Sequence, residues 1–297
     1  MQVFLTGGTG YLGSAVLDAL LKGGHAVTAL VRNGEKAARV RGRGVTPVVG
    51  SLSQPDHWCD AAAGRDAVIH VALDDVGNSA ESDRLTLDAI LPLAPPVFIY
   101  TSGIWVLGAA PSAIDESAQP SQPAEISAWR AGHERRVLEA NRPGARTVVV
   151  RPGIVYGGAR GIVSDMLRDA ANGLIRVIGS GTNHWPLVYD RDLGELYLRL
   201  TTNPGASGVY HATDDADETV NDIVEAIRDA MGQSPSVRHV PLIEARKKLG
   251  PYADALALDQ IVRSTRARAL GWTPTLHSVS RNVPRLIEEF RRGKEAA

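Results

Sequence analysis

A glycine-rich turn near the N-terminus constrains the fold more than any other feature of this sequence. Residues 2–6 (QVFLT) are short, apolar and typical of a buried strand, and Gly7-x-x-Gly10-x-x-Gly13 follows them directly. Apolar residues at helical spacing come next and end at the Gly23-Gly24 pair, before a second apolar run over 26–31. A strand, a turn, a helix and a strand within about thirty residues match one βαβ unit of a parallel sheet.

The same alternation continues along the chain. Further apolar runs that predict strands cover 46–49, 67–71, 97–101 and 147–150, and a helical pattern covers 126–141. Strands that are apolar on both faces and alternate with helices indicate a parallel sheet covered on both sides. We therefore predict an α/β fold, a doubly wound parallel sheet of the Rossmann type with a small C-terminal substrate subdomain.

The pattern changes after Pro152. A glycine-rich loop over 153–161 is followed by shorter predicted strands at 176–178, 187–189 and 208–212. Predicted helices lie between and after them, at 162–172, 190–200, 220–231, 242–249 and 279–292. We expect a nucleotide-binding domain of residues 1–152 that also takes in 187–212. The remaining segments, 153–186 and 213–297, are expected to form the substrate-binding subdomain.

The position of the three glycines gives them a chemical reading. The first glycine allows a tight turn, the second lets the backbone approach a pyrophosphate, and the third lets the helix pack closely on the strand. The N–H groups of the first helical turn, from Tyr11 and Leu12 onward, favour an anion. The sequence therefore predicts a dinucleotide site, although an ordinary strand-to-helix turn rich in glycine is the alternative.

The end of the second strand bears on the choice of nucleotide. An NAD site usually places an acidic residue there to bind the ribose 2′-hydroxyl group. Here the strand ends Leu30-Val31-Arg32-Asn33, and the first acidic residue is Glu35. The planar cationic fork of Arg32 suits a 2′-phosphate, so we expect NADP(H) to be preferred over NAD(H). The alternative is that Arg32 is simply a solvated residue at a strand end.

Composition excludes several other classes of protein. The formal net charge of −1, with both signs mixed along the chain, gives no sign of nucleic-acid binding. The single cysteine, Cys59, excludes a disulfide framework, and no apolar run is long enough to span a membrane. No cluster of ligands with convincing metal spacing is present, so no metal is expected. We expect a cytoplasmic protein with a small-molecule substrate, and base rates of symmetry make a homodimer plausible.

Five motifs together resemble the short-chain dehydrogenase/reductase superfamily, in its extended group of NAD(P)-dependent epimerases and dehydratases. Residues 6–13 (TGGTGYLG) resemble the family's opening loop, and 68–72 (VIHVA) its fourth strand, where Ala72 would pass near the cofactor. The other matching segments are 151–157 (RPGIVYG), 187–193 (LVYDRDL) and 269–274 (ALGWTP). The resemblance covers almost the whole chain, and it implies a Rossmann fold with a bound nucleotide.

The chain departs from this family at its catalytic residues. The family uses a Ser or Thr after the fifth strand and Tyr-x-x-x-Lys on the next helix, where the tyrosine exchanges a proton with the substrate. Here Trp129 stands at the tyrosine position and His133 at the lysine position, and the chain holds no Tyr-x-x-x-Lys. Gly103 aligns with the serine, which leaves Thr101 and Ser102 just before it. An indole does not titrate in the useful range, whereas an imidazole suits acid–base work.

The candidate site residues follow from these alignments. His133, Ser102 and Tyr156 are the candidate catalytic groups. Those expected at the cofactor are Gly7, Gly10, Tyr11, Leu12, Gly13, Arg32, Ala72, Thr101, His133 and Pro152. Those expected at the substrate are Gly103, Trp105, Trp129, Tyr156, His184 and Trp185. For each loop residue among them, the alternative is a structural or solvated side chain.

Three functions remain open on this sequence. The first is an atypical NADP(H)-dependent oxidoreductase acting on a small carbonyl, imine or alkene. The second is a catalytically silent NADP-binding redox sensor or regulator, which needs no proton donor. The third is an epimerase or lyase of the sugar-nucleotide type. Function belongs to the site and not to the fold, so the Trp129/His133 pair decides among them.

Overall fold

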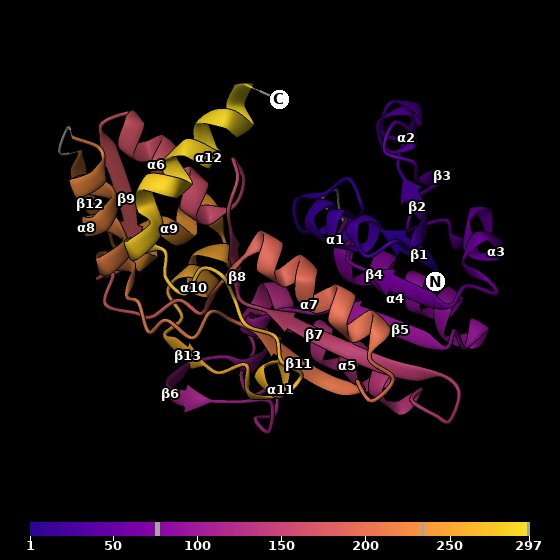
Figure 1. Cartoon of the computed structure of the whole chain (residues 1–297). Helices are drawn as coiled ribbons and strands as arrows, with labels where there is room; N and C mark the ends of the chain where they lie inside the picture. Colours follow the sequence, from indigo (N-terminus) through magenta and orange to yellow (C-terminus); the bar gives the residue numbers. More distant parts are fainter. Residues whose placement is uncertain (75–77, 233–234, 296–297) are drawn as a thin grey trace. The chain divides into compact units, whose positions relative to one another are not determined.

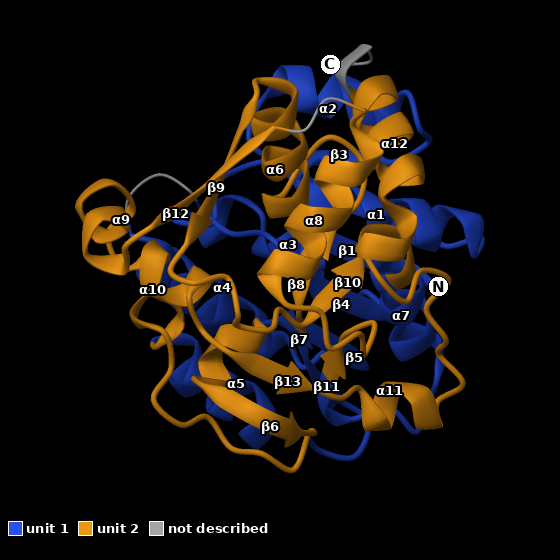
Figure 2. Cartoon of the chain, turned by 90° about the vertical axis from the view of Figure 1, so that its left-hand side faces the viewer, with its two compact units in different colours: residues 1–102, 129–151, 193–210 blue, residues 103–128, 152–192, 211–297 orange. Residues whose placement is uncertain are grey.

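The computed structural model describes residues 1–74, 78–232 and 235–295, and it divides into two compact units. Unit 1 holds residues 1–102, 129–151 and 193–210, and unit 2 holds 103–128, 152–192 and 211–297 (Figure 2). The expected nucleotide-binding domain had included 103–128 and 187–192, and the structure places both segments in unit 2. They belong there because the core clusters of unit 2 take up Ile104, Leu107, Leu187 and Tyr189.

A seven-stranded sheet forms the framework of unit 1, in the order β11-β7-β5-β4-β1-β2-β3 (Figure 1). Every strand pair from β7 to β3 is parallel, which confirms the predicted doubly wound α/β fold. The strands are β1 (Gln2–Thr6), β2 (Ala26–Val31), β3 (Thr46–Val49), β4 (Ala67–His70), β5 (Val97–Thr101), β7 (Arg146–Pro152) and β11 (Gly208–Ala212).

Helices cover both faces of this sheet. They are α1 (Tyr11–Lys22), α2 (Gly34–Arg41), α3 (Cys59–Ala62), α4 (Ser79–Ile90), α5 (Arg130–Glu139) and α7 (Asp190–Thr202). On one face, Leu87 of α4 and Val137 of α5 join a core cluster with Phe4, Phe98 and Trp58. On the other face, α1 and α7 touch so closely that a Cβ atom on Gly194 would lie 2.5 Å from the Ala15 carbonyl oxygen. The predicted helix over 126–141 is shorter, because 125–127 forms a 3-10 turn and α5 begins at Arg130.

Unit 2 packs its helices around three small sheets, each of two parallel strands. The strands are β6 (Ala110–Ile114), β8 (Ile154–Tyr156), β9 (Leu174–Ile178), β10 (Leu187–Tyr189), β12 (Ser236–Val240) and β13 (Gln260–Val262). The helices are α6 (Ile162–Ala171), α8 (Val220–Ala230), α9 (Leu242–Leu249), α10 (Tyr252–Leu256), α11 (Thr265–Ala269) and α12 (Val283–Glu295). The apolar faces of α6, α8 and α12 meet in one core cluster, which also holds Tyr156 and Trp185.

Two expectations for unit 2 were wrong in detail. The segment 153–161 was predicted to be a loop, but 154–156 forms β8, which pairs with β10. Residues 110–114 were not among the predicted strands, yet they form β6 and pair with β13. Both strands depend on partners more than thirty residues away, so local composition gave no sign of them. Among the described helices, none is long and apolar enough to cross a bilayer.

Candidate active site

The glycine turn has the geometry that a dinucleotide requires. Gly7 adopts a φ of +77°, and a Cβ atom there would lie 2.7 Å from the Ala72 nitrogen. A Cβ atom on Gly13 would lie 2.0 Å from the Gly7 carbonyl oxygen, and the Gly10 N–H donates to that same oxygen at 2.8 Å. Neither position tolerates a side chain, so the turn is built from glycine for steric reasons.

Helix α1 begins at Tyr11, directly after this turn. Its N-cap residue is Gly10, and no side chain caps the helix. The N–H groups of the first turn, which includes Leu12, are therefore not satisfied by a capping side-chain oxygen and are available to an anion. Gly7, Ala72 and Ser102 follow β1, β4 and β5, which are neighbours in the parallel sheet, so all three lie at its carboxyl edge.

The residues after β2 present a positive charge at the same edge. Arg32 follows Val31 and is exposed, with no hydrogen bond or ion pair to any other described residue. Asn33 caps α2 by accepting from the Lys36 backbone N–H at 3.0 Å. The guanidinium group of Arg32 is thus available to a ligand phosphate beside a helix N-terminus.

The end of β5 separates the two candidate hydroxyl groups. The Thr101 hydroxyl group lies 2.6 Å from the Tyr197 phenol oxygen on α7, and the Thr101 carbonyl oxygen accepts from Arg130 at 2.8 Å. The Ser102 hydroxyl group is buried and has no hydrogen-bond partner among the residues that the structure describes. A buried hydroxyl group without a partner costs free energy unless a ligand satisfies it. Ser102, rather than Thr101, is the hydroxyl group open to a ligand.

His133 is anchored by a buried carboxylate that sequence reasoning missed. Its Nδ1 atom lies 2.7 Å from Oδ2 of Asp83, a residue of α4 that is only 3% exposed. Tyr100 donates to the same Oδ2 at 2.9 Å, and His70 Nε2 lies 3.0 Å from Oδ1. Burial alone would raise the pKa of Asp83, but the hydrogen bonds from His133 and His70 hold that pKa well below its ordinary value. Asp83 is therefore a carboxylate at neutral pH.

The spacing of the buried residues along α4 could have identified Asp83 as a buried acidic residue. The buried residues of this helix are Ser82, Asp83, Thr86, Leu87 and Ile90. The offsets of three, four and seven residues from Asp83 define the face that packs on the sheet. An acidic residue on such a face needs buried partners, and this requirement could have singled it out.

Trp129 and His133 lie on one face of the helix start, as their spacing of four predicts. Their rings meet edge to face with centroids 5.0 Å apart, and the Arg130 guanidinium group lies over the indole, 4.4 Å from its centroid. The next residue along the helix, Glu134, pairs with Arg151 of β7 at 2.6 Å. Arg130, Glu134 and Arg151 were not predicted as site residues; together they fix α5 to β5 and β7.

The remaining predicted residues belong to unit 2. Gly103 precedes a 3-10 turn that carries Trp105, whose ring meets that of Tyr252 edge to face at 5.9 Å. Pro152 ends β7. Nδ1 of His184 lies 2.7 Å from Asp259. These four positions stay predictions, because no ligand contact tests them.

Tyr156 and Trp185 are less accessible than the sequence suggested. Tyr156 is fully buried, and its hydroxyl group donates to Asp214 at 3.1 Å. Burial and the nearby Asp214 carboxyl group raise the pKa of Tyr156 far above its ordinary value, which disfavours a role as proton donor. The Trp185 indole N–H donates to the Leu256 carbonyl oxygen at 3.0 Å inside the core of unit 2. Both side chains therefore have structural partners within unit 2.

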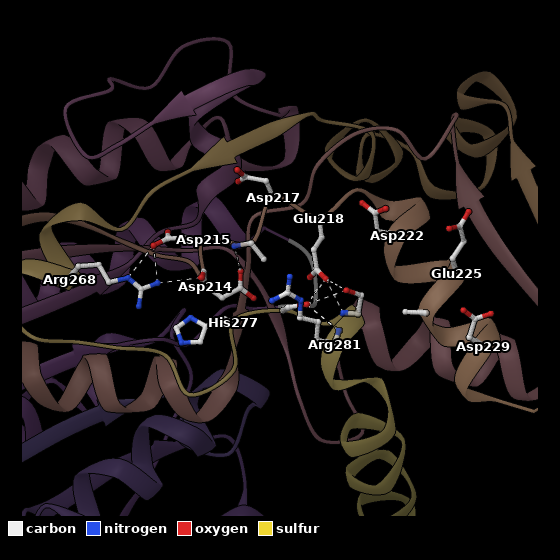
Figure 3. Close-up of a pocket in the computed structure, with 14 residues that line it drawn as sticks. Asp214, Asp215, Asp217, Glu218, Asp222, Glu225, Asp229, Arg268, His277 and Arg281 are labelled. Carbon is white, nitrogen blue, oxygen red and sulfur yellow. Dashed lines mark hydrogen bonds and ion pairs between the residues drawn. The ribbon is translucent and has the colours of Figure 1, made fainter.

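Unit 2 also contains an acidic pocket of about 870 Å³, which the sequence did not predict (Figure 3). Asp222, Glu225 and Asp229 line it from α8. Several of its other carboxylates are satisfied within the chain: Asp215 pairs with Arg268 at 2.8 Å, and Glu218 accepts from Ser278 at 2.7 Å. Among the described residues, no group of three His, Cys, Asp or Glu side chains could hold a metal ion.

A parallel sheet with a glycine turn at its carboxyl edge defines a nucleotide-binding protein of the Rossmann class. The chain belongs to the NAD-dependent epimerase/dehydratase family, whose model matches residues 3–212. It is 31% identical to the fission yeast protein C2A9.02, an uncharacterised protein of Schizosaccharomyces pombe, over 93% of this chain and 95% of that one.

Two further comparisons concern proteins with a printed activity or ligand. A 4-hydroxy-2-methyl-3-oxo-4-farnesyl-3,4-dihydroquinoline-1-oxide ketoreductase of Stigmatella aurantiaca is 30% identical, over 83% of this chain and 78% of that one. The solved structure of the human epimerase family protein SDR39U1 with NADPH has a TM-score of 0.79 at 20% identity, and it covers 97% of this chain and 99% of that one. At that identity the likeness concerns the fold alone.

Proposed function

We propose that this chain is an NADP(H)-dependent oxidoreductase that reduces a small carbonyl, imine or alkene substrate. The observation that carries the proposal is the Asp83–His133 pair, which puts an anchored imidazole where the family has its lysine. A ring fixed at Nδ1 leaves Nε2 for a ligand, and Nε2 has no hydrogen bond to any described residue. The His133 side chain is 13% exposed, so it is not sealed in the core.

The fit of a nucleotide rests on two features of unit 1. The glycine turn leaves no room for side chains where the backbone must approach a pyrophosphate. The buried Ser102 hydroxyl group lacks a partner at the same edge of the sheet. Gly7, Gly10, Gly13 and the first turn of α1 would hold the pyrophosphate. When bound, NADPH supplies a hydride for the substrate carbon.

The proton that the reaction requires would come from side chains of the protein. For a carbonyl substrate, the Ser102 hydroxyl group would donate a hydrogen bond to the carbonyl oxygen. Protonated His133 would then transfer its Nε2 proton to that oxygen as the hydride arrives at the carbon. Proton transfer would leave His133 as a neutral imidazole, which would take up a proton from solvent before the next turnover. Trp129, which stands at the family's tyrosine position, would pack against the substrate and supplies no proton.

The exposed Arg32, with no acidic residue at the end of β2, supports the preference for NADP(H). We expect Arg32→Ala to raise the Kd for NADPH by about 10- to 100-fold, because a charge-assisted bond contributes about 1.5–3 kcal/mol. The Kd for NADH should change by less than about twofold. Equal effects on both nucleotides would refute the preference.

The experiment that tests the function is an NADPH titration followed by a substrate screen that follows nicotinamide absorbance. Turnover of a carbonyl, imine or alkene that is lost in His133→Ala, with the Kd for NADPH retained, is the expected result. Tight NADPH binding without turnover across a broad panel would favour the regulator instead. Full activity in His133→Ala would refute the role of His133.

Two expectations about the cell and the assembly stay predictions. Nothing in the fold tests a cytoplasmic location or a homodimer. Fractionation of the native protein and light scattering on the purified chain measure them directly.

A further inference from the structure

Asp83 is at the centre of a hydrogen-bonded network that joins five elements of unit 1, namely β1, β4, α4, β5 and α5. Ala72 donates its backbone N–H to the Thr6 hydroxyl oxygen at 3.3 Å, directly beside the glycine turn. That hydroxyl oxygen lies 2.7 Å from His70 Nδ1, and His70 Nε2 lies 3.0 Å from Asp83 Oδ1. The other carboxylate oxygen of Asp83 contacts Tyr100 and His133. This hydrogen-bonded network therefore extends from the glycine turn to His133, the proposed proton donor.

Counting protons fixes the tautomers of both neutral imidazoles. An ionised Asp83 only accepts, so each nitrogen that faces it must carry a hydrogen. His70 is then protonated at Nε2, which leaves Nδ1 to accept from the Thr6 hydroxyl group. His133 is protonated at Nδ1, which leaves the lone pair on Nε2. Every contact in this hydrogen-bonded network then has one donor and one acceptor.

The groups around the carboxylate support its ionised state. His70 faces it from β4, Tyr100 from β5 and His133 from α5. Arg130 of α5 adds a positive charge, while Glu134 of the same helix is neutralised by Arg151. Burial, together with Asp83, raises the pKa of Tyr100 well above its ordinary value, so Tyr100 remains a donor. On α4 itself, Glu81 pairs with Arg84.

We propose that Asp83 is the positioning residue of this site. It holds two neutral histidines in opposite tautomers. Nε2 of His133 is then free to take up the proton that it passes to the reacting oxygen, and His70 links this arrangement to the cofactor turn. This inference rests on the proposed oxidoreductase function for its consequence, but the tautomers can be measured without any turnover. Asp83 acts through His133 and does not itself touch the substrate.

The first test is a long-range nitrogen–proton NMR spectrum of the full chain labelled with ¹⁵N in its histidines. Spectra of His70→Gln and His133→Gln assign the two rings. At a pH where both rings are neutral, we expect His133 protonated at Nδ1 and His70 at Nε2. His133 protonated at Nε2, or a fast mixture of its two tautomers, would overturn the proposal even if the enzyme is active.

The second test compares Asp83→Asn with Asp88→Asn, a change on the same helix at a half-exposed residue paired with Arg84 and Arg136. An amide has one acceptor oxygen and cannot serve three donors, so in Asp83→Asn the His133 tautomers should mix. We expect kcat to fall at least about 100-fold, with KM and the Kd for NADPH within about threefold. Asp88→Asn should keep both tautomers and kcat.

A third variant covers the case in which Asp83→Asn does not fold. Tyr100→Phe removes one of three donors and keeps both histidine contacts, so the tautomers should persist and kcat should change less than about fivefold. Mixed His133 tautomers in Tyr100→Phe would refute the assignment to Asp83. If no substrate turns over but the tautomers are as stated, the positioning role stands and the oxidoreductase function fails.

Discussion

At the scale of single residues, the stability of unit 1 depends on charged side chains that are buried in pairs. The Glu134–Arg151 pair lies between α5 and β7, with both side chains 3% exposed. Two hydrogen bonds from Arg151 Nε and one from its Nη2 reach the carboxylate. Each charge of this pair offsets the cost of removing the other from water. Removing one partner should therefore lower the free energy of unfolding more than removing both.

We expect Arg151→Met to lower the free energy of unfolding by about 3–5 kcal/mol, because it leaves Glu134 as an unpaired buried charge. Adding Glu134→Leu should recover most of that loss. Urea denaturation of the two single variants and the double variant measures the coupling. Additive losses would contradict a compensated pair.

Asp214 of unit 2 shows the opposite effect of burial. Desolvation raises its pKa to about 8, well above the ordinary value of 3.8. The folded state therefore holds this proton more tightly than the unfolded state. Its contribution to stability is fully present below about pH 4 and is lost as the pH rises through about 8.

The substitution Asp214→Asn removes this titration. We expect the free energy of unfolding of the wild type to fall relative to that of Asp214→Asn between pH 5.5 and pH 9. At pH 5.5 the variant should be the less stable, by about 1 kcal/mol, since one amide oxygen replaces two acceptors for Tyr156 and Ala216. Denaturant titrations at both pH values measure this difference, with Asp229→Asn, a change at an exposed residue of α8, as the control. A constant difference between the two pH values would contradict the raised pKa.

At the scale of elements, the turn between β1 and α1 is the most constrained segment. Gly7 and Gly13 satisfy steric requirements that no other residue meets, as the 2.0 Å approach of a Gly13 Cβ atom to the Gly7 carbonyl oxygen shows. The obstacle is backbone and not the end of a flexible side chain, so it has little freedom to shift.

We expect Gly13→Ala to displace α1 from the turn and to weaken NADPH binding at least about tenfold. The control is Gly42→Ala, where φ is −61° and an added Cβ atom would meet only ordinary contacts at 3.7 Å. That variant should bind NADPH as the wild type does. Isothermal titration calorimetry compares the two, and equal affinities would contradict the packing argument.

At the scale of the whole molecule, the chain combines a Rossmann unit with a second unit built from three separate segments. The residues predicted to contact the nucleotide lie mostly in unit 1, which also holds the hydrogen-bonded network around Asp83. Ligand binding to the folded state alone stabilises it by mass action.

We expect NADPH at about 100 times its Kd to raise the free energy of unfolding by about 2.7 kcal/mol. NADH at the same concentration should raise it less, because its Kd is expected to be higher. Thermal unfolding followed by calorimetry measures both. No stabilisation by either nucleotide would contradict a dinucleotide site and, with it, the proposed function.

The fold class and the glycine turn between β1 and α1 could be read directly from the sequence, and the turn's role in binding a cofactor stays a prediction. The parallel strands are apolar on both faces, and the glycine spacing is a local steric requirement, so both can be read from neighbouring residues. The bounds of β1, β2, β3 and β5 were correct to the residue for this reason. Strand β8 was missed because it exists through its pairing with β10, more than thirty residues away.

The tertiary structure alone decided how the candidate site is held. The sequence brought His133 and Ser102 forward by their alignment, but it could not show that Asp83, fifty residues before His133, fixes the imidazole. It also could not show that Thr101 is bound to Tyr197 while Ser102 has no partner. Hydrogen bonds between side chains of different elements depend on packing that brings distant residues within 3 Å. Spacing along a single helix or strand does not contain that information.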